Sequence, residues 1–368
     1  MNSISIDALR QELWSAELME DVIRDVESTM RFMGEDSNNV IQISKNIEKK
    51  GGDVETFGLV ARLSGSGVTG DDELEGNEET MLSYAEQVAI DQIRNAVRLK
   101  GKLDAKKTVY DQIKSARSVV QMWMKEFICR QIFLKLAGVT NTSLTDVNGV
   151  TVGTRCTWSN TPDYIPDADT AAGTGARYIC AESTGAASLA AADTMTLDLV
   201  TKAATKAKLA DPKIQPISMG GDDFYVMFLH PLCARDIRIS SDWKTAQENA
   251  KVRSDSNPVF RGALGYWSNV LLVESEFVPW LDVSAAGNSF RGTSTGTDYA
   301  VDCAANLLCG RQAALIAQAS NPEALVVETF DYKNKDGVAG SFIGGIQKTM
   351  FNSKEFGVIQ VDAAAAVA

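Results

Sequence analysis

One uninterrupted helical pattern of about 36 residues limits how this chain can fold more than any other feature. Apolar residues recur through it at seven-residue intervals in two neighbouring rows: Ile113, Val120, Phe127 and Leu134, with Ala116 and Trp123 beside them. No Pro or Gly interrupts residues 102–137, and Gly138 follows them where a helix commonly ends in a glycine. The pattern predicts a rod of roughly 50 Å at ~1.5 Å per residue, a length that suits a structural spine.

Two β-like segments, residues 56–63 and 83–99, precede this helix and flank an acidic, glycine-rich stretch. The second segment alternates in part, and its candidate inward residues are Val88, Ile90, Val97 and Leu99. The intervening SGSGVTGDDELEGNEET predicts a long, mobile hairpin between the two strands. Its acidic tip cannot be buried in the chain's own core, because unpaired charges are costly to remove from water.

The other segments predict an α+β protein with more than one lobe, since 368 residues exceed the usual size of one compact domain. Residues 1–50 predict short helices with a thin apolar stripe, and residues 139–192 predict loops with short strands. Helices are predicted at 194–209 and 232–237, the second opened by Pro231. Strands are predicted at 214–219, 224–229, 324–330, 342–350 and 356–361, with a structured stretch at 257–277 and a final alanine tail that has little to pack.

The composition argues against several classes of protein. The chain carries 36 basic and 48 acidic residues, a net charge of −12, whereas general nucleic-acid binders gain affinity by neutralising phosphates. The chain contains no apolar run of 18 or more residues, so no transmembrane helix is predicted. Its first residues lack the basic segment and the apolar segment of a secretion signal. Six cysteines without CxxC spacing and one histidine argue against zinc and predict buried, reduced thiols: Cys129, Cys156, Cys180, Cys233, Cys303 and Cys309.

Two patterns in the acidic stretch resemble ligand sites. Gly65, Gly67 and Gly70 spell G-x-G-x-x-G, but they lead into acidic residues that would repel a phosphate, so loop flexibility is favoured over nucleotide binding. The acids of residues 71–75 lack the spaced D-x-D-x-D loop of a calcium site, and a solvated or partner-facing loop is favoured.

His230 is the one histidine available to a Ser-His-Asp or Cys-His site. It lies between Leu229 and Pro231, at a predicted strand-to-helix turn, and no G-x-S-x-G pattern occurs in the chain. A structural role is therefore favoured over a catalytic one.

Opposite charges are separated along the chain. The predicted hairpin apex carries six acids: Asp71, Asp72, Glu73, Glu75, Glu78 and Glu79. A basic stretch follows it: Arg94, Arg98, Lys100, Lys102, Lys106 and Lys107, with Lys114 and Arg117 beyond. The two patches could pair within one molecule, or the hairpin could reach the next copy. Head-to-tail contacts of the second kind close into rings, and complementary charge would help to choose their register.

Several sequence blocks occur in a fixed order. RLSGSGVTGDDELEGNEE and VAIDQIRNAVR lie within residues 62–103, and they are followed by FLHPLCARDIR, NPVFRGALG and FNSKEFGVIQVDAA at 228–238, 257–265 and 351–364. These blocks resemble the major capsid (coat) protein family of tailed bacteriophages typified by the N4-like podoviruses. The resemblance covers most of residues 56–364.

The resemblance implies an HK97-like capsid fold of the α+β class. Its parts would be an N-terminal arm (1–54), an E-loop hairpin (55–100), a peripheral domain (101–192) with spine helix 102–137, an axial domain (193–320) and a C-terminal return to the peripheral domain (321–368). The chain would then form hexamers and pentamers, with axial domains around the symmetry axes and E-loops overlapping neighbours. It would be a structural protein of the icosahedral virion capsid, made in the bacterial host cytoplasm, and not an enzyme, with no cofactor and no membrane contact. The shell would enclose dsDNA without sequence-specific contact.

Departures from the family pattern bear on assembly. Residues 51–99 contain no Lys, so a loop-lysine cross-link is chemically excluded there. No large N-terminal scaffolding segment precedes the hairpin, which predicts a separate scaffold protein. A portal at one vertex and a cement or decoration protein are the other expected partners. Two alternatives are an encapsulin-like compartment shell and an acidic hydrolase or nucleotide enzyme that uses His230 or the glycine loop.

Overall fold

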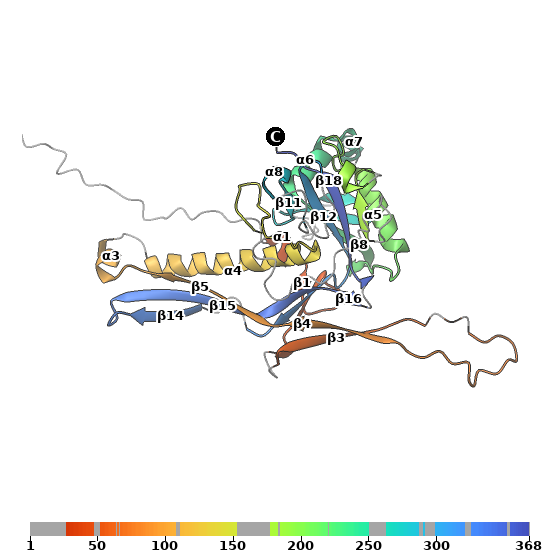
Figure 1. The fold of residues 1–368 in the computed structure, drawn as a ribbon, viewed down its shortest axis with the longest axis horizontal. Helices are drawn as coiled ribbons and strands as arrows, with labels where there is room; N and C mark the ends of the chain where they lie inside the picture. Colours follow the sequence, from red (N-terminus) through yellow and green to blue (C-terminus); the bar gives the residue numbers. More distant parts are fainter. Residues whose placement is uncertain are drawn as a thin grey trace, which may run out of the picture.

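The structure, a computed structural model, describes residues 27–47, 52–63, 65, 67–107, 111–152, 177–182, 185–219, 221–249, 263–286, 290, 299–320, 325–351 and 354–367. Figure 1 shows three parts: a flat layer in which a long helix lies over a narrow ribbon of strands, a rounded part above one end of that helix, and a hairpin that projects beyond both. The mixture of helices and sheets confirms the α+β class.

The predicted spine is two helices, so the expectation of one continuous helix over 102–137 was wrong. Helix α3 covers Lys102–Lys107 and α4 covers Gln112–Leu136. Between them Asp111 has an extended backbone, and its carboxylate accepts hydrogen bonds from the amides of Ile113 and Lys114 at 3.0 and 3.2 Å. This N-cap starts a new helix at residue 112. The 25 residues of α4 give a length of about 38 Å.

Burial changes along α4. Its first half buries one stripe through Ala116, Val120 and Met124, whereas residues 127–136 are buried on every side. The helix ends as predicted at Gly138, where φ is +63°. The amides of Gly138 and Val139 reach back to the carbonyls of Lys135 and Leu134 at 3.1 and 2.9 Å, the paired bonds of a Schellman motif.

A mixed sheet lies beneath α4. Its order is β1 (Met33–Gly34), β2 (Ile41–Ser44), β13 (Ala314–Gln318), β15 (Lys335–Lys348) and β14 (Leu325–Phe330), and β5 (Asp91–Arg98) also pairs with β15. The short helix α1 (Glu27–Met30) precedes β1. The prediction that residues 1–50 form only short helices was therefore wrong for β1 and β2, because Ile41 is buried and its strand pairs in parallel with β13. Residues 1–26 lie outside the described part.

The projecting hairpin consists of β3 (Val54–Val60) and β4 (Ser83–Ala89), paired antiparallel from Val54↔Ala89 to Val60↔Ser83. The second predicted strand, 83–99, is divided at Ile90, where the chain leaves β3 and pairs with β15 as β5. Gly345 of β15 allows the crossing, because a Cβ there would lie 2.1 Å from the Ala89 carbonyl oxygen. Val88 is fully buried as expected, and Ile90, Val97 and Leu99 are half-buried.

The rounded part is built on a second sheet of order β6 (Tyr178–Cys180), β18 (Val358–Ala364), β12 (Cys303–Cys309), β8 (Asp222–Leu229), β10 (Val270–Glu274) and β9 (Ala263–Trp267). Strands β7 (Ile217–Met219) and β11 (Trp280–Leu281) pair with β8 and β12. Helices of this part are η3 (Ala186–Ser188), α5 (Leu197–Leu209), α6 (Pro231–Ile239), α7 (Ser241–Asn249) and α8 (Val283–Ala286). The predicted helices at 194–209 and 232–237 are confirmed within a few residues, and Pro231 is the first residue of α6.

Successive side chains of β8 point to opposite faces of the second sheet, so the strand contributes to two hydrophobic cores. Val226 and Phe228 face the core that contains the end of α4, and the Phe228 ring meets Phe133 edge to face with centroids 5.1 Å apart. Tyr225 and Met227 face the opposite core, beneath α5 and α6. The second sheet is therefore covered on both faces.

Sheet membership crosses the predicted domain boundaries. β13 lies with β14 and β15, although the boundary was placed after residue 320, and β18 lies in the sheet of β8 and β12. The alanine tail also packs more than expected, since Ala363, Ala364 and Ala365 are buried. The small hairpin of β16 (Met350–Phe351) and β17 (Lys354–Glu355) connects the long strand β15 to β18.

Candidate inter-subunit surfaces

The apex of the hairpin, residues 65–82, is stabilised by local hydrogen bonds beyond the β3–β4 ladder. The amide of Gly65 donates to the Glu79 carboxylate at 2.6 Å, and the amide of Gly76 donates to the Glu78 carboxylate at 2.7 Å. Asn77 turns the tip, its amide bonding the Leu74 carbonyl at 3.0 Å. Three glycines have positive φ values, which L-residues adopt with strain: Gly67, Gly70 and Gly76.

All six acids of the apex are exposed: Asp71, Asp72, Glu73, Glu75, Glu78 and Glu79. Large apolar side chains are exposed behind them, where the ladder begins: Val60, Leu63, Met81 and Leu82, each more than half accessible. The hairpin therefore presents acid at its tip and apolar surface along its stem.

The basic residues gather at the other end of the flat layer. Arg94 and Arg98 lie on β5, and Lys100 leads into α3, which carries Lys102, Lys106 and Lys107; all six are exposed. The amides of Leu99 and Lys102 bond the carbonyls of Asp336 and Asn334 at 2.9 and 3.1 Å, so this end is tied to the β14–β15 turn.

Arg94 and Arg98 point to the face of the ribbon that α4 does not cover. Their partners in β15 are Ser341 and Gly337, and paired residues point to the same face of a sheet. Side chains alternate between the faces along a strand, so Val338 and Gly340 of β15 point to the opposite face, toward α4. The Arg98 guanidinium lies 4.8 Å from the centre of the Phe330 ring, a cation–π contact across the space left by Gly337.

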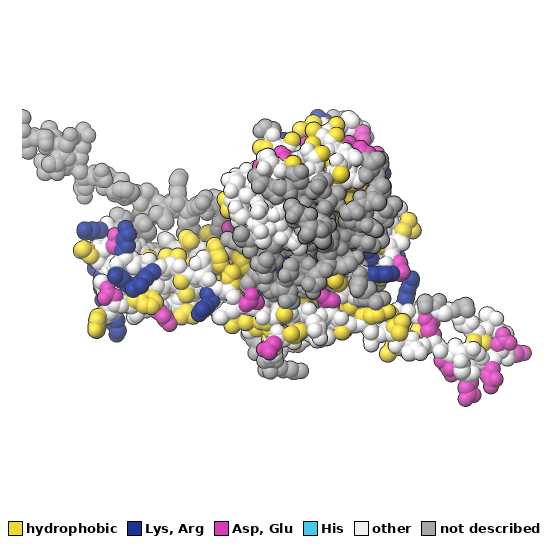
Figure 2. Space-filling view, viewed as in Figure 1, with side chains coloured by type: hydrophobic (Ala, Val, Ile, Leu, Met, Phe, Trp, Pro, Cys, Tyr) yellow, Lys and Arg dark blue, Asp and Glu magenta, His cyan; other side chains and the backbone are white. Residues whose placement is uncertain are grey.

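Figure 2 shows the acidic apex and the basic end at opposite ends of the long axis of the molecule. The structure brings the six predicted basic residues together and the six predicted acids together, but it does not bring the two groups into contact. Salt screens exposed charges beyond about 10 Å at 0.1 M, so the two patches do not neutralise each other within one subunit.

The glycine pattern is not placed for nucleotide binding. Gly65, Gly67 and Gly70 lie in an exposed loop between β3 and the acidic tip, whereas a dinucleotide site requires a strand that leads into a helix N-terminus. Within the described residues, no cluster of three or more His, Cys, Asp or Glu side chains could hold a metal ion.

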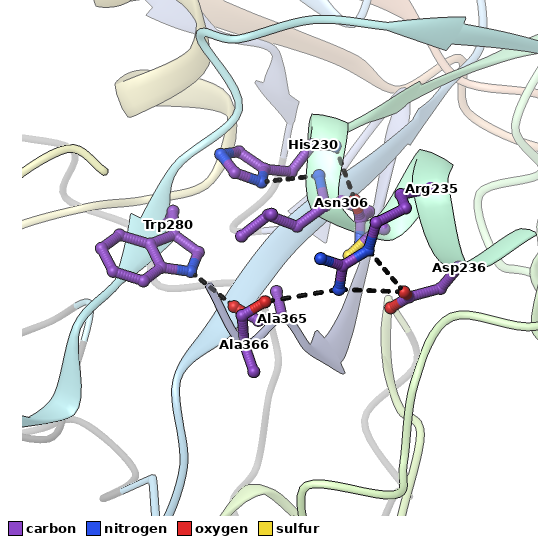
Figure 3. A network of polar contacts seen from close by, with 9 residues as sticks. His230, Arg235, Asp236, Trp280, Asn306, Ala365 and Ala366 are labelled. Atoms are coloured by element: carbon purple, nitrogen blue, oxygen red, sulfur yellow. Dashed lines mark hydrogen bonds and ion pairs between the residues drawn. The ribbon is translucent and has the colours of Figure 1, made fainter. Parts of the chain in front are cut away.

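His230 occupies a capping position at the start of α6. Its Nδ1 accepts a hydrogen bond from the Leu232 amide at 3.4 Å, its own amide donates to the Asn306 side chain at 3.0 Å, and the side chain is 4% exposed. In Figure 3 the bond between His230 and Asn306 joins the start of α6 to β12. His230 is therefore the N-cap of α6.

The same network holds the C-terminal strand. Trp280 donates its indole N–H to the Ala365 carbonyl at 2.9 Å, and Arg235 donates to the Ala366 carbonyl at 3.4 Å while it pairs with Asp236 at 3.2 Å (Figure 3). No local sequence pattern predicts this network, because the alanines that it holds contribute only backbone carbonyls.

Four of the buried cysteines are poor nucleophiles. Burial raises the pKa of the Cys233 thiol, one turn after His230, to about 12, and that of Cys309 also to about 12. Burial likewise raises the pKa values of Cys180 and Cys303. Because the thiolate is the reactive form, these groups are inert near neutral pH. Five cysteines are buried and unbridged, as predicted: Cys129, Cys180, Cys233, Cys303 and Cys309; Cys156 lies outside the described residues.

Among the helices of the described residues, none combines the length and apolarity needed to cross a bilayer.

Comparison with known proteins gives the family. The family model described as "Phage capsid protein" matches residues 2–367. The major capsid protein of Pseudomonas phage KPP25 is 28% identical over 373 residues, covering 97% of this chain and 95% of the relative. The capsid of Ralstonia phage GP4 is 30% identical, with a TM-score of 0.80 over 97% of this chain and 96% of that one.

More distant structures share only the fold. The capsid of cyanophage Pam1 has a TM-score of 0.74 at 22% identity, covering 98% of both chains. An encapsulin from Synechococcus elongatus has a TM-score of 0.51 at 10% identity, covering 99% of this chain and 96% of that one. The nearer structural relatives are phage capsids of the HK97-like fold. The chain therefore belongs to the phage capsid protein family, and it is a major capsid protein with the HK97-like fold.

Proposed function

We propose that this chain assembles as hexamers and pentamers into an icosahedral shell around the phage dsDNA, and that it has no catalytic activity. The observation that carries the proposal is the separation of an acidic apex and a basic end along one elongated subunit of a capsid family. A subunit that cannot neutralise its own ends can do so by contact with the next copy. Head-to-tail contacts of this kind close into rings.

In the proposed contact, the acidic apex of one subunit lies on the basic end of its neighbour. The acids are Asp71, Asp72, Glu73, Glu75, Glu78 and Glu79, and their partners are Arg94, Arg98, Lys100, Lys102, Lys106 and Lys107. Each exposed pair contributes about 0–1 kcal/mol, so a single pair cannot hold the contact. The exposed apolar stem of the hairpin supplies the buried area, and the charges choose the register.

Other parts of the assembly belong to the same proposal. The division into an arm, E-loop, peripheral domain, axial domain and C-terminal return rests on the family resemblance, as do a separate scaffold protein, a portal and a cement protein. With a net charge of −12, the shell would enclose DNA without gripping it. Assembly would take place in the bacterial host cytoplasm.

The test is a charge reversal with a matched control. Asp71→Lys with Asp72→Lys reverses two neighbouring exposed acids of the apex, and Asp222→Lys with Asp223→Lys makes the same change on exposed acids at the start of β8. We expect the apex variant to stay folded but to form few or no shells in electron micrographs. The β8 variant is expected to assemble normally.

Rescue sharpens the assignment of the partner surface. Adding Lys106→Glu and Lys107→Glu to the apex variant restores opposite charge between copies, so shells are expected to return. Normal shells from the apex variant alone would refute the electrostatic contact. A wild-type chain that forms no shells or rings, with or without its scaffold, would refute the proposed function itself.

A further inference from the structure

Within the described residues, strand β14 is an open edge of the sheet beneath α4. All six of its residues pair with β15, from Leu325↔Gly340 to Phe330↔Lys335, and it is the last strand in the sheet order. In Figure 1 it lies on the outer side of β15, far from the hairpin. Its second row of backbone amides and carbonyls therefore faces away from the sheet.

The strand lacks the usual protection of an open edge. Its sequence LVVETF contains no Lys, Pro or Gly, and Glu328 is its one charge. Five of its six residues are exposed, among them Val326 at 56%, Val327 at 38% and Phe330 at 39%. Soluble monomers protect such edges with lysines, prolines or bulges, because an apolar edge pairs with other chains. An unprotected edge in an assembling protein indicates that pairing is its function.

We propose that β14 pairs antiparallel with β14 of a second copy, across a two-fold axis that passes through Val327. The inference rests on the proposed self-assembly and adds a contact distinct from the hairpin apex. Backbone hydrogen bonds of the two edges supply the affinity, as in other cases of strand addition. The two β14–β15–β5 ribbons then form one continuous sheet, with both copies of α4 on the same side of it.

The register follows from symmetry and charge. Residues that face each other in an antiparallel pair point to the same side of the sheet, so a two-fold axis must pass through a residue rather than between two. An axis at Glu328 would place two carboxylates directly opposite each other, which is unfavourable.

An axis at Val326 would pair only residues 325–327 within the strand. The axis at Val327 pairs residues 325–329, placing Val327 opposite its own copy and Val326 opposite Glu328. It brings β-branched side chains together at the centre and keeps the two carboxylates apart.

The test is a cysteine at the axis. In the proposed register, residue 327 and its copy have Cα atoms about 4.5–5.5 Å apart, within the range of a disulfide. Shells of Val327→Cys, assembled under reducing conditions and then mildly oxidised, are expected to give a covalent dimer on a non-reducing denaturing gel. Val326→Cys is the matched control, since its copy lies diagonally across the pair, and wild-type shells report the background from the native thiols.

The outcomes separate the register from the contact. Several-fold more dimer from Val327→Cys than from Val326→Cys supports the pairing. Intact shells with no such excess refute it, and dimer from Glu328→Cys instead refutes the register. The absence of shells from the wild type is a failure of the proposed function rather than of this inference.

A second variant tests the edge without relying on cysteine. Val327→Lys adds a lysine to the open edge and is expected to reduce shell formation several-fold, while Leu209→Lys, at a position 80% exposed on α5, is expected to have no effect. If the two lysine variants assemble equally well, the β14–β14 contact is refuted. This comparison still tests the contact if Val327→Cys forms no shells.

Discussion

The buried ion pair between Lys348 and Glu355 allows a quantitative test of how the long strand β15 is anchored. The ammonium and carboxylate are in direct contact, and their side chains are only 3% and 1% exposed. Lys348→Met leaves the Glu355 carboxylate in the interior without its cation. Removing one partner of such a pair costs about 3–5 kcal/mol, a large part of a typical folding free energy of about 5–15 kcal/mol.

The same strand provides a control. Lys335, the first residue of β15, pairs with Asp331 at 3.3 Å, but the two side chains are 37% and 47% exposed. Lys335→Met is therefore expected to change the stability of the subunit little, because solvent screens an exposed pair. The Lys348→Met/Glu355→Leu double variant removes both charges of the pair, so part of the loss is expected to be recovered.

Urea unfolding of the unassembled subunit, followed by tryptophan fluorescence, measures these differences as shifts of the midpoint. Equal shifts for Lys348→Met and Lys335→Met would refute the reasoning, because they would mean that burial does not set the cost. A double variant as unstable as the single Lys348→Met variant would show that the lost stability comes from packing rather than from an unpaired charge.

Two further predictions concern the spine and the thiols. Asp111→Ala removes the N-cap of α4 and is expected to cost about 1 kcal/mol in the same urea assay, whereas Asp111→Asn retains the acceptor and is expected to cost much less; equal losses would contradict the capping role. A colorimetric thiol reagent at pH 8 is expected to leave the five buried cysteines unlabelled in the native subunit and to label all six cysteines after unfolding, because the reagent cannot reach a buried thiol. Rapid labelling of two or more native thiols would contradict that expectation.

Local signals predicted several elements well. Gly138 marked the end of α4, because glycine adopts the left-handed backbone conformation there with little strain. Pro231 marked the start of α6, because the first amides of a helix make no hydrogen bond within it and proline lacks that amide hydrogen. The apolar repeat identified α4, since its spacing follows directly from the helical turn. These features depend only on neighbouring residues, so the sequence alone carries them.

The failures share a different cause. Asp111 was available as a start signal, but the regular pattern on both sides of it favoured one long helix over two. The short strand β2 depends on its partner β13, about 270 positions later in the chain, and short segments carry little signal about distant partners. The division of 83–99 at Ile90 likewise reflects a change of partner, which no local pattern encodes.

The candidate surfaces were predicted in part. Clustering along the sequence was enough to group the acids of the apex and the bases near α3, and the structure keeps both groups exposed. The open edge of β14 was not predicted, because a strand that is exposed on both faces has the same apolar composition as a buried one. An exposed edge strand differs from a buried strand in its position in the sheet order, and this position depends on the whole fold.

The continuity of β4 into β5 determines how the subunit carries mechanical load. The projecting hairpin meets the sheet under α4 through one residue, Ile90, with no loop to absorb strain. A pull on the apex along the chain therefore acts on the eight residue pairs between β5 and β15, from Gly337↔Arg98 to Gly344↔Asp91. Those pairs are loaded in shear, so their hydrogen bonds share the force and break together rather than one after another. A subunit held by a neighbour at its hairpin would thus resist outward pressure with its central ribbon and α4 as one unit.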